Sequence, residues 1–390
     1  MPNIIPCCPV CKSNTPSLFL QRLRVPVHQN LLAPTPEAAV DITRGDLSMA
    51  VCQDCGFVFN TTFDLSLLRY GAEYDNNQTC SSTFRTHLDE LVRHLTEDEG
   101  VRDCCIVDVG CGSGDFLRRM VEAPGANNTG VGFDPAYRGP DNDHSGRIRF
   151  ESRYYGPDCT DVKADVVICR HVIEHVPEPA KLLQAIRAAL TGSPKARVYF
   201  ETPDVSWIFR NTVVWDFFYE HCSLFTPQSL STAFEKSGFA VSSVKTVFGG
   251  QYQWLEATAA GQSDAKTGDG SNVTALAEAF AEAEHGLVDR WKAILIELAD
   301  RGKTALWGAG AKGATFANLL DPNRNLIDCV VDLNPSKQGR FIPGTGHAIV
   351  DYRELKTRGV KSAILMNPNY LKENQSLLSE ANISVELICH

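Results

Sequence analysis

Tyr219, Glu220 and His221 stand side by side in the segment WDFFYEHCSLFTPQSL, between aromatic residues and shortly after an apolar run that is typical of a buried strand. A histidine next to a carboxylate can act as a general base near neutral pH, because its ordinary pKa lies close to that pH. We therefore predict that His221 and Glu220 take part in proton transfer. The alternative for His221 is a structural role, with its ring nitrogens satisfied by neighbouring groups.

A second group of reactive side chains follows another predicted strand, in CRHVIEHVPEP, which contains His171, Glu174 and His175. Glu201 lies near the end of the predicted strand ARVYFETP, before Tyr219. Doubly wound sheets bind their ligands outside the carboxyl ends of the strands. The sequence therefore predicts that these side chains converge on one site, with Glu201 among the substrate contacts.

Four cysteines form two C-x-x-C pairs, Cys8 with Cys11 and Cys52 with Cys55. Each pair presents two thiolates from one tight turn, and two such turns complete a tetrahedral zinc site. Four thiolate ligands leave no open position for substrate, so the predicted zinc is structural and holds the lobe that carries RVPVHQNLL. The alternatives are unrelated buried cysteines or a redox pair, which usually opens a helix after a strand.

The segment IVDVGCGSGDF is predicted to be an apolar strand that ends at Asp108 and leads into Gly110, Gly112 and Gly114. The glycines allow the backbone to approach a ligand closely. Roughly 20 residues further on, the predicted strand GVGFD ends in Asp134, whose carboxylate can accept hydrogen bonds from both ribose hydroxyls of an adenosine. The loop ends in Gly-Asp, which suits a cationic amino-acid group on that adenosine better than a phosphate.

A second glycine loop, WGAGAKG, fits the pattern G-x-G-x-x-G at Gly308, Gly310 and Gly313. It follows a predicted strand and precedes the predicted helix ATFANLL, with Asp332 roughly 20 residues further on. The pattern by itself indicates a dinucleotide site, with NAD as the ligand and its pyrophosphate at the helix N-terminus. Lys312 is placed to meet a phosphate. The remaining alternative is a Rossmann-like domain that binds nothing.

The elements that must position these residues alternate between strands and helices, which predicts parallel sheets and an α/β fold. A polar segment of small residues, 259–272, is predicted to be a linker. The predicted units are a zinc-binding domain (1–62), a helical connector (63–100), a central Rossmann-like domain (101–260), a linker with a helix (261–285) and a C-terminal Rossmann-like domain (286–390).

The bulk composition limits the class of protein. The chain has 390 residues, 43% of them hydrophobic, and a formal net charge of -10. An acidic balance argues against nucleic acid as a partner, and no stretch approaches the roughly 18 apolar residues of a membrane span. The first residues lack the charged start and apolar core of a secretory signal. We expect a cytoplasmic protein that acts on a small molecule, as a monomer or a homodimer.

The segments VDVGCGSGDF, GFDP and CRHVIEHVPEP, taken together in this order, resemble the class I S-adenosylmethionine (SAM)-dependent methyltransferases. The resemblance implies that the three glycines of the first loop line the methionine part of SAM and that Asp134 holds its ribose. It also implies a wider set of cofactor contacts, made up of Asp108, Phe116, Pro135 and His171.

The chain as a whole resembles the C-methyltransferases that act on nucleotide-linked keto-sugars, which combine a zinc-binding N-terminal domain, a methyltransferase domain with a YEH loop and a C-terminal domain with WGAGAKG. By that resemblance His221 is the base that removes a proton from the carbon next to a ketone. Glu220 orients His221 or stabilises the enolate, and the catalytic group also takes in Tyr74, Tyr219 and His175. Carbon methylation needs such a site because a C–H carbon is a poor nucleophile until a base forms the enolate and donors hold its charge.

The same resemblance gives the second glycine loop a different use, which is to hold the nucleotide end of the substrate through Gly310, Lys312, Gly313 and Asp332. The predicted function is the transfer of a methyl group from SAM to a carbon of a nucleotide-linked or otherwise phosphorylated keto compound. Three alternatives stay open: an O- or N-methyltransferase, a nucleotide-binding module without turnover, and an NAD-dependent oxidoreductase.

Overall fold

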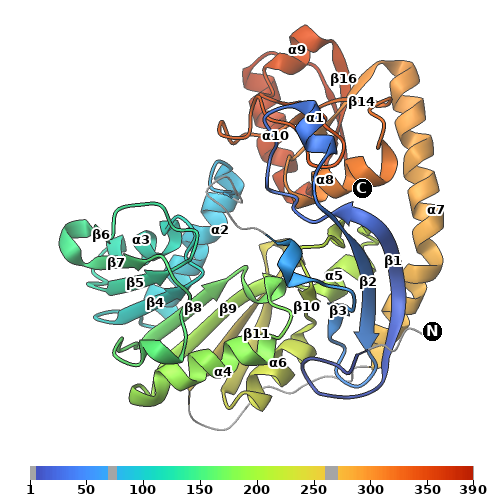
Figure 1. Ribbon diagram of the computed structural model, residues 1–390. Coiled ribbons are helices and arrows are strands. Elements are labelled where there is room, and N and C mark those ends of the chain that lie inside the picture. Colours follow the sequence, from blue (N-terminus) through green and yellow to red (C-terminus); the bar gives the residue numbers. More distant parts are fainter. Residues whose placement is uncertain (1–5, 69–76, 260–270, 390) are drawn as a thin grey trace.

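The computed structural model describes residues 6–68, 77–259 and 271–389, and these residues form three β-sheets (Figure 1). The strand orders are β1-β2-β3-β10, β11-β12-β9-β8-β4-β5-β7-β6 and β15-β14-β13-β16-β17. The two larger sheets alternate with helices along the chain, so the predicted α/β fold class is confirmed. No described helix is long and apolar enough to cross a lipid bilayer.

The N-terminal sheet is built mainly from a long antiparallel hairpin, β1 (Pro16–Pro26) and β2 (Arg44–Cys52), to which β3 (Val58–Asn60) is added. A short helix, α1 (Pro36–Val40), lies between the hairpin strands in the sequence. The fourth strand, β10 (Ser223–Leu224), comes from the central part of the chain and pairs antiparallel with β3. Because β10 closely follows His221, this pairing fixes the predicted catalytic segment against the N-terminal lobe, residues 6–62.

The central sheet has a parallel middle, in which β9, β8, β4, β5 and β7 are neighbours, whereas β12 pairs antiparallel with both β9 and β11. Its strands are β4 (Cys105–Val109), β5 (Thr129–Phe133), β6 (Asn142–Asp143), β7 (Ile148–Glu151), β8 (Val166–Arg170), β9 (Arg197–Pro203), β11 (Ala240–Val247) and β12 (Tyr252–Thr258). Its helices are α2 (Ser82–Arg93), α3 (Asp115–Glu122), α4 (Pro179–Ala189), α5 (Val205–Arg210) and α6 (Pro227–Lys236). Since β4 and β8 are parallel neighbours, the loops that follow them emerge at the same edge of the sheet.

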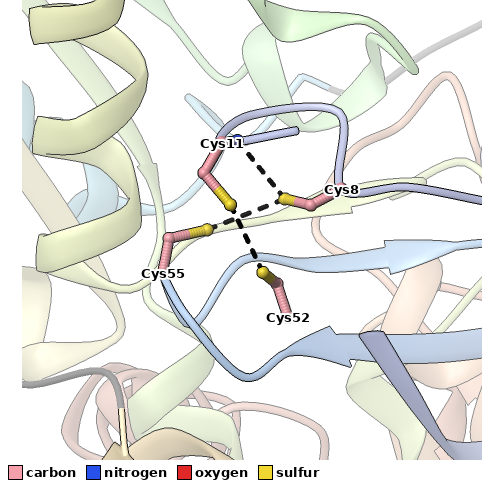
Figure 2. A group of neighbouring side chains, drawn as sticks. All are labelled: Cys8, Cys11, Cys52 and Cys55. Carbon is pink, nitrogen blue, oxygen red and sulfur yellow. Dashed lines mark hydrogen bonds between the residues drawn. The ribbon is translucent and has the colours of Figure 1, made fainter. Parts of the chain in front are cut away.

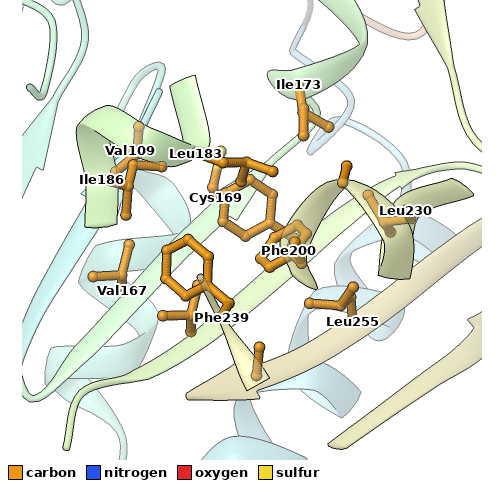
Figure 3. Packing of buried hydrophobic residues seen from close by; sticks show 14 of the residues in the cluster. Val109, Val167, Cys169, Ile173, Leu183, Ile186, Phe200, Leu230, Phe239 and Leu255 are labelled. Carbon is orange, nitrogen blue, oxygen red and sulfur yellow. The ribbon is translucent and has the colours of Figure 1, made fainter. Parts of the chain in front are cut away.

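An apolar core between this sheet and α4 holds the strand ends in place (Figure 3). Val109, Val167 and Phe200, on β4, β8 and β9, pack in one cluster with Leu183 and Ile186 of α4, and all five side chains are buried. Burial of side chains of this size stabilises the fold by roughly 1.5–3 kcal/mol each. The loops after β4 and β8 therefore start from rigid positions.

The C-terminal sheet is parallel throughout. Its strands are β13 (Lys303–Trp307), β14 (Ile327–Val331), β15 (Ile349–Val350), β16 (Val360–Leu365) and β17 (Glu386–Ile388), and its helices are α8 (Ala311–Leu320), α9 (Glu354–Arg358) and α10 (Leu371–Glu380).

A single long helix, α7 (Ser271–Arg301), contacts both the N-terminal hairpin and β13 (Figure 1). Its side chains Trp291, Leu295 and Leu298 are buried. The unit boundary expected at residue 285 falls inside this helix, because the same helix packs against both domains along its length. Most of the predicted linker, residues 260–270, lies outside the described residues.

The segment 63–100, predicted to be mostly helical, contains a single helical turn at Leu65–Leu67, then α2, then a π-helical turn at His94–Asp98. Ser81 caps α2 by accepting a hydrogen bond from Phe84 N. Tyr74 and the rest of 69–76 lie outside the described residues.

Candidate functional site

The first glycine loop joins β4 to α3, as predicted, and its glycines adopt left-handed conformations, with φ values of 74° at Gly110, 55° at Gly112 and 80° at Gly114. A Cβ atom on Gly110 would lie 2.2 Å from Val172 Cγ2, and one on Gly114 would lie 2.4 Å from Phe150 Cε1. A Cβ on Gly112 would meet no atom of the described residues within 4 Å. Packing of the protein itself therefore requires the outer two glycines, whereas Gly112 faces open space in which a ligand can lie against the backbone.

Two aspartates flank this loop. Asp134 follows β5, and its Oδ2 accepts a hydrogen bond from Gly112 N at 2.9 Å, while its Oδ1 accepts one from Ala136 N at 2.7 Å. Asp108 on β4 is buried, and this burial raises the pKa of its carboxyl to about 7, although Arg170 opposes the rise. A cationic group bound at the loop would favour the ionised form of Asp108.

The remaining predicted cofactor residues next to this loop differ in exposure. Phe116 on α3 is buried, with the Arg170 guanidinium carbon 4.6 Å from the centre of its ring. Pro135, next to Asp134, is exposed. Phe116 thus belongs to the packing of α3, and Pro135 is accessible to a ligand.

A cavity of about 220 Å³ is lined by residues from the N-terminal lobe, the central domain and the C-terminal domain. That volume is more than ten times the roughly 10–15 Å³ that a cavity needs to hold one water molecule, so a small molecule fits. The predicted site residues that line it include His171, His175, Glu220, His221, Gly310, Lys312, Gly313 and Asp332. The structure thus brings the predicted catalytic segment and the second glycine loop into one site.

The segment after β8 separates this cavity from the first glycine loop. Val172 packs on Gly110, whereas its neighbours His171 and Glu174 line the cavity. None of the first-loop glycines is among the described residues that line it. A molecule on the first loop and a molecule in the cavity would therefore meet at residues 171–175.

His221 presents a neutral imidazole to the cavity. Its ring lies 4.1 Å from that of Phe218 and 4.8 Å from that of His175, measured between centroids. Its Nδ1 is buried and makes no hydrogen bond with a described residue. Burial lowers the pKa of His221 well below its usual range, and neighbouring groups, above all His175, lower it further. A neutral ring with an available nitrogen is the form that accepts a proton.

A network of charged groups lies beside the cavity around His171, which has a left-handed backbone with φ of 54°. Its Nδ1 lies 3.4 Å from Glu174 Oε1, and its Nε2 lies 3.4 Å from Glu201 Oε2. Burial alone would lower the pKa of His171, but the two carboxylates outweigh burial and raise it to about 9. His171 is therefore a cation at neutral pH.

We expect the free energy of unfolding to fall as the pH rises from 6.5 towards 9, in part through His171. Its pKa of about 9 in the folded chain exceeds the ordinary 6.5 of the unfolded chain, so the folded state binds the proton more tightly. That stabilisation is complete below pH 6.5 and is lost as the pH passes through 9. Urea unfolding at several pH values should show a shallower decline for His171→Gln. Equal slopes for both proteins would contradict this expectation.

The structure places the Glu220 carboxylate against the N-terminal lobe and not against His221, which it was predicted to orient. Its Oε2 accepts a hydrogen bond from Gln29 N at 2.8 Å, and its Oε1 lies 3.4 Å from His28 Nδ1. Both oxygens therefore face the loop that follows β1. Glu220 lines the cavity, but its carboxylate holds the N-terminal lobe in place.

Tyr219 and Glu201, predicted as a catalytic residue and a substrate contact, lie outside the cavity. The Tyr219 hydroxyl accepts a hydrogen bond from Asp64 N at 2.8 Å. Glu201 is fully buried, with Oε1 at 2.6 Å from His87 Nε2 and Oε2 accepting a hydrogen bond from Arg170 Nε at 2.7 Å. Both side chains contact protein partners that lie far from them in the sequence, which is why the sequence did not reveal these contacts.

The second glycine loop joins β13 to α8, as predicted. A Cβ atom on Gly313 would lie 2.0 Å from Gly308 O, so the close packing of helix on strand requires glycine there. Asp332 Oδ2 accepts a hydrogen bond from Ala309 N at 2.9 Å. Lys312 Nζ forms an ion pair with Asp216 Oδ2 at 2.7 Å and thereby links the loop to the central domain.

Lys337 is a cavity residue that sequence reasoning missed. The residue is only 5% exposed, and its Nζ lies 3.3 Å from Ala309 O and 4.0 Å from Asp332 Oδ2. The available signal was its place shortly after Asp332 in DLNPSK, but lysines are mostly exposed, so this place did not mark Lys337 as a cavity residue. Asn30, Tyr252 and Asn374 also line the cavity without a pattern that marks them in the sequence.

The four cysteines of the two C-x-x-C pairs meet in one cluster (Figure 2). Their sulfur atoms all lie within 4.8 Å of one another, with Cys8 Sγ at 3.7 Å from Cys55 Sγ and Cys11 Sγ at 3.5 Å from Cys52 Sγ. A tetrahedron of sulfurs about 2.3 Å from a central zinc has edges of about 3.8 Å. The thiol donors and their spacing therefore fit a four-thiolate zinc site.

Two known protein families match separate parts of the chain. Residues 82–244 match the family model of a methyltransferase domain, and residues 263–382 match that of a C-methyltransferase C-terminal domain. The chain therefore contains a methyltransferase domain, which carries the first glycine loop and His221. A C-methyltransferase C-terminal domain follows, and it carries the second glycine loop.

Curated relatives match parts of the chain. A ubiquinone biosynthesis O-methyltransferase from Yersinia enterocolitica is 30% identical over 136 residues, which is 31% of this chain and 49% of that protein. The corresponding protein from Aeromonas salmonicida is 33% identical over 103 residues, covering 25% of this chain and 42% of its own length. The chain thus spans about half the length of the curated relatives it matches.

Among solved structures, a 1,6-didemethyltoxoflavin-N1-methyltransferase from Burkholderia thailandensis, with S-adenosylhomocysteine bound, superposes with a TM-score of 0.35 and 16% identity. That superposition covers 48% of this chain and 80% of the other. A magnesium protoporphyrin IX methyltransferase from Synechocystis PCC 6803 has a TM-score of 0.34 and 16% identity, over 45% of this chain and 83% of the other.

Proposed function

We propose that this chain is a SAM-dependent methyltransferase that places the methyl group on a carbon next to a ketone, in a nucleotide-linked or similarly phosphorylated small molecule. The observation that carries the proposal is a neutral His221 in a cavity shared by a methyltransferase domain and a C-methyltransferase C-terminal domain. Methylation of an oxygen or nitrogen has less need of such a base, whereas methylation of a carbon requires one.

The donor site in this proposal is the first glycine loop. The open space at Gly112 fits a ligand lying against the backbone, and Asp134 offers a carboxylate for ribose hydroxyls. Asp108 beneath the loop complements a cationic amino-acid group. SAM, when bound, supplies a methyl group already activated by its sulfonium. The residues of the chain bind and orient it.

Asp134→Ala should weaken binding of S-adenosylhomocysteine by about tenfold or more, because a carboxylate that accepts hydrogen bonds from ribose hydroxyls is lost. Calorimetric titration measures this, with Asp141→Ala, an exposed aspartate nearby, as the control. Unchanged affinity would remove Asp134 from the donor site. Binding of NAD(H) with no response to S-adenosylhomocysteine would overturn the methyltransferase proposal.

The acceptor lies in the cavity. The His221 imidazole removes a proton from the carbon next to the ketone, and the electron pair left behind forms an enolate. Negative charge then develops on the ketone oxygen, and two cationic groups that line the cavity, His171 and Lys312, favour that charge. Residues 171–175 hold the acceptor beside the donor loop, so that the carbon, the methyl group and the sulfur can align.

The C-terminal domain holds the nucleotide or phosphate part of the acceptor in this proposal. The second glycine loop lines the cavity at the start of α8, and Lys312 and Lys337 add positive charge there. Backbone N–H groups at a helix start and lysine side chains are groups that bind phosphates.

Solvent exchange tests this function directly. Nucleotide-linked keto-sugars are incubated with the protein and S-adenosylhomocysteine in deuterated water, and then with SAM in ordinary water. We expect deuterium at a carbon next to the ketone in the first case and a methyl group at that same carbon in the second. Methylation of an oxygen or nitrogen, without exchange at carbon, would overturn carbon methylation in favour of the O- or N-methyltransferase alternative, to which the curated matches give some support.

We also propose that Cys8, Cys11, Cys52 and Cys55 hold a structural zinc ion. Cys52→Ser should abolish stoichiometric zinc binding and lower the free energy of unfolding by more than about 4 kcal/mol, because loss of a metal ligand is among the most destabilising changes. Metal analysis and urea unfolding measure these effects. The matched control is Cys7→Ser, since Cys7 is exposed and outside the cluster. Wild-type protein purified without zinc and stable to a chelator would contradict the site.

A further inference from the structure

A histidine and two glutamates meet outside the cavity, at the end of α2. His94 begins the π-helical turn that follows α2, Glu99 comes directly after that turn, and Glu256 lies on β12. A ring nitrogen of His94 and one carboxylate oxygen of each glutamate lie within 4.8 Å of one another. None of the three residues is among the described residues that line the cavity, so the proposed methyl transfer leaves them without a role.

The π-helical turn brings His94 and Glu99 together. Glu99 N donates a hydrogen bond to His94 O at 3.0 Å, so the bond spans five residues where an α-helix spans four. Arg197 also donates a hydrogen bond to Glu99 O and holds this backbone beside the start of β9. Turns of this kind are rare and occur frequently at functional sites. The backbone that carries both side chains is therefore fixed in place.

His94 is oriented in the way that metal-binding histidines are. Its Nδ1 lies 2.9 Å from Asp98 Oδ2, and its Nε2 lies 2.9 Å from Glu256 Oε1. A histidine that ligates a metal almost always donates its other ring N–H to a carboxylate, a carbonyl or water, which fixes the tautomer and the direction of the ring. Asp98 fits that outer role, so Nε2 is the nitrogen left to ligate.

Each glutamate is likewise held through one of its oxygens. Glu256 Oε2 accepts a hydrogen bond from Ser243 Oγ at 2.9 Å, and Glu99 Oε2 accepts one from the Tyr199 hydroxyl at 3.2 Å. Outer partners of this kind orient the ligands of a metal site. The second oxygen of each carboxylate, Oε1, is the one left to ligate beside His94.

The charges around the cluster favour a cation. Asp98, Glu99 and Glu256 supply three carboxylates, whereas Lys245 Nζ lies 3.5 Å from Glu256 Oε1. The Lys245 side chain is 57% exposed, so it can turn into solvent when another cation enters. The His94 side chain is 24% exposed and that of Glu256 only 10%, so the cluster is partly shielded yet accessible to a small ion.

We propose that His94, Glu99 and Glu256 bind a divalent first-row transition-metal ion, which joins the end of α2 to β12. An imidazole among the ligands favours such an ion over magnesium or calcium, which prefer oxygen ligands. Metal bonds of roughly 2.0–2.2 Å to nitrogen and oxygen put neighbouring ligand atoms about 2.8–3.6 Å apart. The 2.9 Å between His94 Nε2 and Glu256 Oε1 lies in that range. A proton held between these two atoms leaves to solvent when the ion binds, because the ligands must be deprotonated.

Electron paramagnetic resonance of Mn²⁺ mixed with the full chain tests the site, because the spectrum of free Mn²⁺ broadens when the ion binds protein. Thiolates are soft ligands that select other metals, so the four clustered cysteines do not compete for this probe. The wild type should bind one equivalent, which a large excess of Mg²⁺ leaves in place. His94→Ala should lose that equivalent, and His285→Ala, at an exposed histidine of α7, should keep it.

Further variants separate a metal site from a cluster of ion pairs. Asp98→Asn should weaken Mn²⁺ binding by about tenfold or more, the usual effect of losing such an outer partner. Lys245→Ala should strengthen binding, because a competing cation is removed. Glu256→Gln should lose the bound equivalent. If that protein fails to fold, Glu99→Gln, at a less buried residue, takes its place in the comparison.

Equal binding of Mn²⁺ by the wild type and His94→Ala, displacement by Mg²⁺, or unchanged affinity in Asp98→Asn would overturn the inference. A wild-type protein that leaves the spectrum of free Mn²⁺ unaltered would overturn it equally. Each of these results would leave the proposed function standing, because the three ligands are not among the cavity residues.

Discussion

Replacing His221 with alanine is expected to slow methyl transfer by about 10²–10⁴-fold, the usual contribution of a positioned general base. The physical reason is that no other described group of the cavity combines an unpaired buried nitrogen with a pKa held well below the normal range of histidine. Exchange of the acceptor's C–H for deuterium should fall in parallel, because His221 acts before the methyl group moves.

Binding of S-adenosylhomocysteine should stay within about twofold of the wild type in His221→Ala, since residues 171–175 separate the two sites. The matched control is His285→Ala, at a histidine whose side chain is 95% exposed on α7. A His221→Ala protein that methylates at the wild-type rate would disprove the base and favour transfer to oxygen or nitrogen.

Glu201→Ala is expected to lower the free energy of unfolding by about 3–5 kcal/mol. Glu201 is fully buried and contacts Arg170, His171 and His87. Burial opposes its ionisation, but Arg170 and the two histidines hold the pKa of Glu201 well below its usual range. Removing it leaves the largely buried guanidinium of Arg170 without its carboxylate partner.

Urea unfolding compares Glu201→Ala with Glu178→Ala. Glu178 forms an ion pair with Lys181 in which both side chains are more than half exposed, and its loss should change stability by no more than about 1 kcal/mol. Glu201→Gln, which keeps the shape and removes the charge, should fall between the two. If Glu201→Ala is as stable as Glu178→Ala, the network around His171 has no structural importance.

Much of the fold followed from short-range patterns. The apolar runs at 105–109 and 303–307, each followed by a glycine loop, form β4 and β13 as expected. The two C-x-x-C pairs meet because each pair is a compact turn and β2 carries the second pair towards the first. Helix α2 and the buried face of α7 likewise follow the 3.6-residue period of their apolar side chains.

Long-range packing limited the sequence-based prediction of the site. Glu220 appeared suited to orient its neighbour His221, yet its oxygens face Gln29 and His28, nearly 200 positions away in the sequence. The Tyr219 hydroxyl accepts a hydrogen bond from the backbone N–H of Asp64, far away in the sequence. The prediction of a unit boundary at residue 285 was wrong for a related reason. Helix α7 contacts elements of two domains and continues through residue 285 without a break.

The sequence by itself determined the local chemistry: which residues can donate, accept, ligate or approach a ligand, and which strand and loop carries each. Adjacent residues are enough to specify these features, because they depend on side-chain type, backbone freedom and the period of the apolar residues. Only the tertiary structure decided which side chains share the cavity and which are instead hydrogen-bonded to other protein groups. Asn374, Lys337 and His221 come from three separate segments. Their common site exists because α7 contacts both the N-terminal hairpin and β13, and because β10 of the central part of the chain pairs with β3, so that residues far apart in the chain come together.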